Sequence, residues 1–289
     1  MTEAIEWQGR VGNVWAEEWR LTDMSFAALA KSLDAAIAAA APERGQALDI
    51  GCGAGVTTFA LAGARPYLDI LGVDLSERLV AVATERGEGK EHVAFRAVDV
   101  ARLADEPGQT GRFDFAFSRH GVMFFAGPVA GFRNIRRLLR PGAALVFSCF
   151  ADPARNPWVT RITSIATGEE SANASPAQAD AAYVPGPFAF ADPALVRDVL
   201  SQAGFIPGAP QLIDYAYRAG EGPDAAAQAL HFFQRIGPAA RMLATIEPDA
   251  RPAILQRLAA LLAEHARDGV VEFPASAWIW TARADEGRS

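Results

Sequence analysis

The chain has 289 residues, of which 51% are hydrophobic and 21% charged, and its formal net charge is -7. This size allows a large buried core, and the acidic balance lacks the basic face that sequence-independent binding of nucleic acid requires. The two cysteines are too few for a disulfide framework or a cysteine-built metal site. The first residues do not resemble a signal peptide, and no apolar run is long enough to span a membrane. We therefore expect a cytoplasmic protein that binds neither nucleic acid nor metal.

The first 44 residues predict helices rather than strands. Phe26, Leu29, Leu33 and Ile37 recur at helical intervals, and the pattern ends near Pro42. Tryptophans stand among glutamates and arginines before this segment. We expect two helices ahead of the first strand.

Strand and helix patterns then alternate along the chain. Ser76 is placed to cap one of the intervening helices. Apolar runs predict strands at 46–50, 68–73, 92–98, 113–118 and 143–150. Four strand–helix alternations followed by a fifth strand predict a parallel sheet with helices on both faces.

The second half of the chain is less regular. Prolines and small residues predict a long insertion at about 151–190, with one helix around 158–166. A second insertion, at about 221–268, is predicted to be helical. Between and after them we expect a helix at 192–203 capped by Asp192 and strands at 211–217 and 270–282.

The stretch LDIGCGAG, residues 48–55, predicts a tight turn that brings bare backbone against a ligand. An apolar strand breaks into the alternating glycines Gly51, Gly53 and Gly55, and helical spacing resumes at Val56. A dinucleotide fingerprint would place its third glycine at position 56. The spacing therefore disfavours a nicotinamide-dependent oxidoreductase.

Acidic residues close the next two predicted strands. Asp74 stands about 20 residues after the glycines, where a carboxylate accepts hydrogen bonds from ribose hydroxyls. Asp99 closes the third strand, where it would accept a hydrogen bond from an adenine amino group. Because the carboxyl ends of parallel strands meet at one edge, these motifs predict one ligand-sized edge of the sheet.

The order and spacing of these motifs resemble those of the class I S-adenosylmethionine-dependent methyltransferases. The resemblance rests on LDIGCGAG, on GVDLS at 72–76, on AVDV at 97–100, on FDFAFSRHGVMFF at 113–125 and on LRPGAALVFSCF at 139–150. The later segments FAFADPALVRDVLSQAGF and IGPAARML are similar to a bacterial branch related to ubiquinone and menaquinone biosynthesis methyltransferases.

The resemblance implies a Rossmann-like, doubly wound α/β fold with a mostly parallel, seven-stranded sheet. Residues 1–44 would cover the cofactor site. Residues 45–289 would form the methyltransferase domain, whose helical insertions make a substrate lid.

The same resemblance implies a site for S-adenosyl-L-methionine. Asp49 and the glycines would line its methionine part, Asp74 its ribose, and Asp99 with its neighbour its adenine. The full implied set is Trp15, Asp49, Gly51, Gly53, Gly55, Asp74, Leu75, Asp99, Val100 and Ser118.

The implied activity is methylation, at oxygen or carbon, of a small apolar or aromatic molecule by direct displacement. A phenol or carboxylate needs little help from a base, whereas an aliphatic hydroxyl needs one, and His120 and His231 are the candidates. The alternative is a protein of the same fold that binds the cofactor without transferring methyl, such as a cyclase. The acceptor, the methylated atom and the oligomeric state stay open, a homodimer included.

Overall fold

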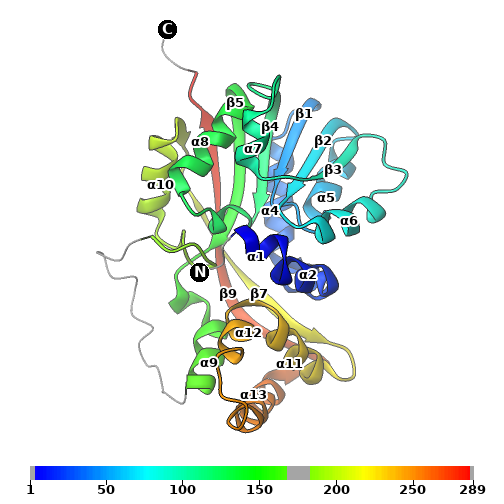
Figure 1. Ribbon diagram of the computed structural model, residues 1–289, viewed down its shortest axis with the longest axis vertical. Helices are drawn as coiled ribbons and strands as arrows, with labels where there is room; N and C mark the ends of the chain where they lie inside the picture. The colour runs from blue at the N-terminus through cyan, green and yellow to red at the C-terminus, as the bar shows by residue number, and fades with distance from the viewer. Residues whose placement is uncertain (1–3, 168–182, 287–289) are drawn as a thin grey trace.

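The computed structural model describes residues 4–167 and 183–286 of the chain. Within these ranges a nine-stranded sheet runs through the molecule, with helices on both faces (Figure 1). Seven strands follow the order β3-β2-β1-β4-β5-β9-β6, and β7 and β8 pair with β9 beside this path. The prediction of a doubly wound α/β fold is confirmed. The expected count of seven strands was too low because two further strands, β7 and β8, pair with β9.

The parallel part of the sheet consists of the first five strands, and β9 pairs with β5 in the antiparallel sense. All sequence-predicted strands are present, several of them longer than expected. The strands are β1 (Arg44–Ile50), β2 (Tyr67–Asp74), β3 (Val93–Ala97), β4 (Phe113–Arg119), β5 (Leu139–Phe150), β6 (Phe205–Pro207), β7 (Gln211–Glu221), β8 (Ala266–Arg267) and β9 (Val270–Ala284).

Helices pack their apolar stripes against the two faces of the sheet. On one face Leu33 and Ile37 of α4 (Ala27–Ala40) and a leucine of α5 (Val56–Ala64) cover Phe115 of β4. The other face is covered by α7 (Val100–Asp105), α8 (Pro128–Leu138) and α10 (Pro193–Gln202). Spacing of three to four residues puts the apolar side chains of each helix on one face, which is why these segments bury a single stripe.

Side-chain caps fix where several helices begin. Ser76 Oγ accepts the backbone N–H of Leu79 at 3.2 Å and starts α6 (Glu77–Arg86), and Asp192 caps α10, as the sequence predicted. Asp99 was expected to close the third strand. The strand ends at Ala97 instead, and the Asp99 carboxylate accepts the N–H of Ala101 at 2.7 Å as the cap of α7.

Between residue 4 and β1 the structure has four helices, so the expectation of two was wrong. They are α1 (Ala4–Gln8), α2 (Arg10–Glu17), α3 (Trp19–Ser25) and α4. The breaks fall at Gly9, Glu18 and Phe26. Short interruptions of this kind leave the apolar periodicity intact, which is why the sequence pattern did not reveal them.

The insertions form a separate helical layer at one end of the sheet (Figure 1). The first contains α9 (Pro157–Thr167), close to the predicted helix, and its residues 168–182 lie outside the described residues. The second forms α11 (Ala225–Arg235), α12 (Gly237–Leu243) and α13 (Arg251–His265). Among the described helices none is long and apolar enough to cross a membrane.

Candidate functional site

A cavity of about 970 Å³ lies at the carboxyl ends of the parallel strands. Its floor comes from the ends of β1 to β5 and the turns that follow them. Its walls come from the N-terminal helices, through Trp15 and Asp23, and from the insertion helices, through Trp158 and Phe232. The cavity therefore occupies the sheet edge at which the sequence placed a ligand.

The glycine turn lines this cavity in part. Gly51 and Gly53 have φ angles of 66° and 54°, which side-chain-bearing residues rarely adopt, and both line the cavity. A Cβ atom on Gly51 would lie 2.9 Å from the Cα of Gly121, whereas one on Gly53 would meet no atom within 4 Å. Gly53 thus presents bare backbone to open space. Gly55 is not among the lining residues, because it packs against the ring of Phe59.

Asp74 joins the end of β2 to the glycine turn. Its Oδ2 accepts the N–H of Gly53 at 2.9 Å, and its Oδ1 accepts the N–H of Ser76 at 2.9 Å. Burial raises the pKa of Asp74, and these hydrogen bonds oppose that rise. Each carboxylate oxygen has a second lone pair, so Asp74 retains capacity for hydroxyl groups of a ligand.

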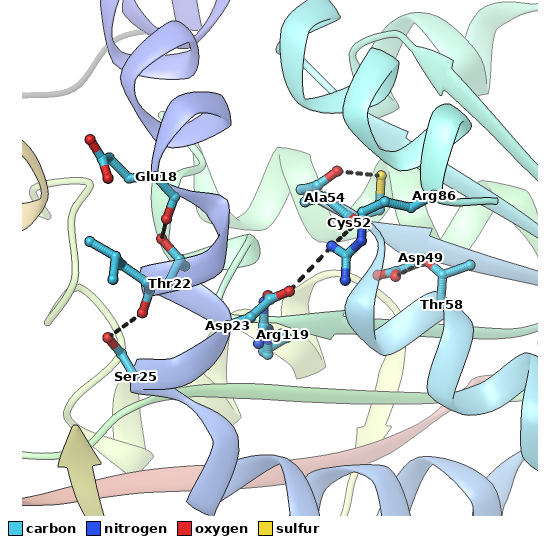
Figure 2. Close-up of polar contacts among 12 residues, drawn as sticks. Glu18, Thr22, Asp23, Ser25, Asp49, Cys52, Ala54, Thr58, Arg86 and Arg119 are labelled. Carbon is cyan, nitrogen blue, oxygen red and sulfur yellow. Dashed lines mark hydrogen bonds and ion pairs between the residues drawn. The ribbon is translucent and has the colours of Figure 1, made fainter. Parts of the chain in front are cut away.

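Asp49 is 1% exposed, and one of its two carboxylate oxygens has a hydrogen-bond partner. Thr58 donates its hydroxyl to Oδ2 at 2.6 Å, as Figure 2 shows, while Oδ1 has no partner among the described residues. Burial raises the pKa of Asp49 to about 7, against the lowering influence of Thr58 and Arg119. A positively charged ligand group at the glycine turn would compensate this buried carboxylate.

An ion-pair cluster ties the N-terminal helices to this end of the cavity (Figure 2). Asp23 of α3 pairs with Arg119 at 3.0 Å and with Arg86 at 3.2 Å. Arg86 also donates to the carbonyl of Ala54 at 2.6 Å. The partners lie 63 and 96 positions from Asp23 in sequence, so no local pattern could have identified the cluster.

The remaining cofactor candidates divide into two groups. Trp15, Leu75, Asp99 and Val100 line the cavity together with Asp49 and Asp74. Ser118 does not line it. The Ser118 hydroxyl donates to the carbonyl of Ile50 at 2.7 Å and accepts the N–H of Gly121 at 3.2 Å, so this side chain links β4 to the end of β1.

His120 lines the cavity in an unusual backbone conformation, with φ of 60°. Its ring is buried between Phe26, at a centroid distance of 4.8 Å, and Phe150, at 4.5 Å. Nδ1 lies 2.7 Å from the Ser148 hydroxyl, and Nε2 has no partner among the described residues. Burial, with a contribution from Arg119, lowers the pKa of His120 to about 3, so the imidazole is neutral near pH 7.

The second histidine candidate lies elsewhere. His231 is exposed on α11, and its Nε2 is 2.9 Å from Glu18 Oε1. It is not among the cavity-lining residues, so the structure does not bring it together with His120. In the described part of the chain no group of three or more His, Cys, Asp or Glu side chains is arranged to hold a metal ion.

Comparison with known proteins indicates the same family of domains as the sequence motifs. Residues 48–147 match the family model described as a methyltransferase domain. The ubiquinone biosynthesis O-methyltransferase of Methylococcus capsulatus is 38% identical over 104 residues. Residues 48–147 of this chain are therefore similar to methyltransferase domains. That alignment covers 36% of this chain and 42% of the relative, so the chain spans less than half the length of the curated relatives that it matches.

Solved structures extend the similarity of fold over most of the chain. A candidate methyltransferase from Bacillus halodurans superposes with a TM-score of 0.55 at 16% identity, covering 88% of this chain and 99% of that one. Phosphoethanolamine N-methyltransferase 2 of Haemonchus contortus, solved with S-adenosyl-L-methionine, gives a TM-score of 0.52 at 18% identity, covering 99% of this chain and 61% of that one. At these identities the likeness concerns the fold.

Proposed function

We propose that this protein is a methyltransferase that binds S-adenosyl-L-methionine at the glycine-turn end of the cavity and transfers its methyl group to a small apolar or aromatic molecule, at oxygen or carbon. One observation carries the proposal. Asp49 and Asp74 lie at the ends of β1 and β2, and Asp99 follows β3. All three line one cavity beside the bare backbone of Gly53. That arrangement offers carboxylates to a cation, to ribose hydroxyls and to an adenine amino group within one site.

The residues fit the cofactor in charge as well as in position. The unpartnered, buried Oδ1 of Asp49 suits the positively charged methionine end, and Leu75 and Val100 offer apolar surface to the adenine ring. When bound, the cofactor supplies an activated methyl group on a positively charged sulfur. The chain then has to align the acceptor and exclude water. We further propose that residues 1–44, which contribute Trp15, cover this site.

Aromatic side chains dominate the other end of the cavity. Trp158 and Tyr217 stack with ring centroids 4.6 Å apart and an interplanar angle of 5°, and Phe150 and Phe232 line the same space. Such walls favour a flat, apolar acceptor, because aromatic rings bury large apolar areas and stack on one another. This proposal places the insertions, at about 151–190 and 221–268, as the lid over the acceptor.

The proposed cellular setting is the cytoplasm, with a small molecule and not nucleic acid as the partner. Cys52 and Cys149 are buried and form no disulfide, as expected of a protein in a reducing compartment.

Two measurements test the proposal. Calorimetric titration with S-adenosylhomocysteine should show saturable binding to the full chain. A screen of phenols, quinone precursors, and fatty and polyketide acids should then reveal acceptors whose addition releases S-adenosylhomocysteine from S-adenosyl-L-methionine. Absence of both heat and thermal stabilisation with the cofactor product would overturn the binding site. Binding without product from any acceptor class would count against methyl transfer.

A further inference from the structure

His120 is held against β5 by two bonds to a single residue. Its backbone N–H donates to the carbonyl of Ser148 at 3.2 Å, and its Nδ1 lies 2.7 Å from the Ser148 hydroxyl oxygen. Ser148 has no exposed surface. The φ angle of 60° at His120 and this double link fix the ring in one orientation at the acceptor end of the cavity.

The direction of the side-chain bond follows from the available protons. The Ser148 hydroxyl carries one proton. Among the described residues Nδ1 of His120 is the only hydrogen-bond partner of this hydroxyl. A buried hydroxyl without an acceptor costs about 1–3 kcal/mol. If Ser148 donates to Nδ1, the proton of the neutral ring resides on Nε2. Only one buried group, the Nε2–H, then lacks a partner. The opposite direction leaves two such groups, the hydroxyl proton and a bare Nε2.

A second unpartnered donor lies close by. Trp158 is 4% exposed, lines the cavity, and its indole N–H, which can only donate, has no partner among the described residues. Both rings contact Phe150, with centroid distances of 4.5 Å for His120 and 5.6 Å for Trp158. The guanidinium of Arg119, next to His120 in sequence, also lines the cavity and pairs with Asp23. This end of the cavity thus offers two buried donors without partners, and the positive charge beside them is shared with Asp23.

We propose that Ser148 is a positioning residue that sets the tautomer of His120, that His120 donates a hydrogen bond through Nε2–H, and that the methyl acceptor carries an anionic oxygen, as a phenolate, enolate or carboxylate does. The inference rests on the proposed function and specifies the acceptor. It also assigns His120 to binding, in place of the general base that an aliphatic hydroxyl would require.

The reaction balances without a proton acceptor on the protein. The anionic oxygen forms the new bond to the methyl carbon, and the carbon–sulfur bond breaks with its electron pair going to sulfur. The negative charge of the acceptor and the positive charge of the sulfonium cancel, and no proton is released. A neutral His120 is therefore sufficient for the transfer, because no step requires this ring to accept a proton.

The tautomer can be measured without any acceptor. Two-bond proton–nitrogen correlation spectra of the uniformly nitrogen-15-labelled full chain resolve its four histidine rings, and His120→Gln assigns the signal. We expect one neutral form with the proton on Nε2 across pH 5.5–8.5. Ser148→Ala should change the tautomer ratio and Ser148→Thr should restore it, whereas Ser201→Ala, at an exposed position of α10, should leave it unchanged. A proton on Nδ1 in the wild type would overturn the inference.

The acceptor class is tested by binding of matched probes to the protein saturated with S-adenosylhomocysteine. We expect 2-naphthoate to bind at least tenfold more tightly than 2-naphthylmethanol, which has the same ring system and a neutral aliphatic hydroxyl. His120→Phe, which keeps a ring at this position, should remove most of the difference. Equal affinities in the wild type contradict the anionic class. Failure of S-adenosylhomocysteine itself to bind would instead refute the proposed function, while the tautomer result would remain interpretable.

Discussion

The carboxylate of Asp74 accepts the backbone N–H of Gly53 at 2.9 Å and thereby fixes the glycine turn to the end of β2. Asp74→Ala removes this bond, the bond to Ser76 and the group proposed to hold the ribose. We expect affinity for S-adenosylhomocysteine to fall at least tenfold, measured by calorimetry. Asp69→Ala is the matched control, because Asp69 lies on the same strand, exposed and away from the cavity. An equal loss in both variants would show a general effect on β2.

Alanine substitutions in the glycine turn should separate the energetic cost of a steric clash from the cost of a strained backbone conformation. Gly51→Ala places a Cβ 2.9 Å from the Cα of Gly121 in a left-handed conformation, whereas Gly53→Ala carries only the conformational strain. We expect Gly51→Ala to destabilise the protein more, with the strain alone costing about 1–2 kcal/mol. Gly63→Ala, in the last turn of α5 and with open space around an added Cβ, should stabilise it by about 0.4–1 kcal/mol. Urea unfolding of the three variants measures the order, and the reverse order for positions 51 and 53 would exclude the clash.

The buried Asp49 predicts a pH dependence of stability. Burial raises the pKa of Asp49 in the folded protein from its ordinary value of 3.8 to about 7. Between these pH values the unfolded chain therefore loses the proton while the folded protein keeps it. The free energy of unfolding should therefore fall as pH rises through this window, by roughly 4 kcal/mol in total from this group. Asp49→Asn should flatten the profile and be more stable than the wild type at pH 8. Parallel profiles from pH 4 to 8 for the two proteins would contradict the prediction.

Asp23 should matter far more than an ordinary surface acid. Asp23→Asn removes a carboxylate that balances Arg86 and Arg119, at a position where its side chain is 16% exposed. We expect a loss of about 1–3 kcal/mol in stability, since hydrogen bonds to charged groups contribute that much. Asp105→Asn, which breaks an exposed pair with Arg137, should cost less than about 1 kcal/mol. Thermal unfolding at low and high salt compares the stability of the two variants. Similar losses would show that Asp23 contributes no more than an exposed surface acid.

Local sequence patterns predicted the parallel strands, the caps Ser76 and Asp192 and the helical nature of the insertions, because each depends on periodicity or on a bond a few residues long. These local patterns failed for the breaks between the N-terminal helices and for strand pairs that are distant in sequence. The N-terminal segment forms four helices because brief breaks leave the apolar spacing unchanged. The pairing of β7 and β8 on β9 depends on long-range register, which periodicity does not encode.

The site shows the same division. The sequence by itself determined the glycine turn and the gathering of Asp49, Asp74 and Asp99, since a parallel sheet brings successive carboxyl ends to one edge. Only the tertiary structure decided that Gly55 and Ser118 serve packing and strand linkage, that His231 lies away from the cavity, and that Asp23 bridges two arginines. It also paired His120 with Ser148, 28 positions apart. These contacts join segments that are distant along the chain, so their physical basis exists only after the chain has folded.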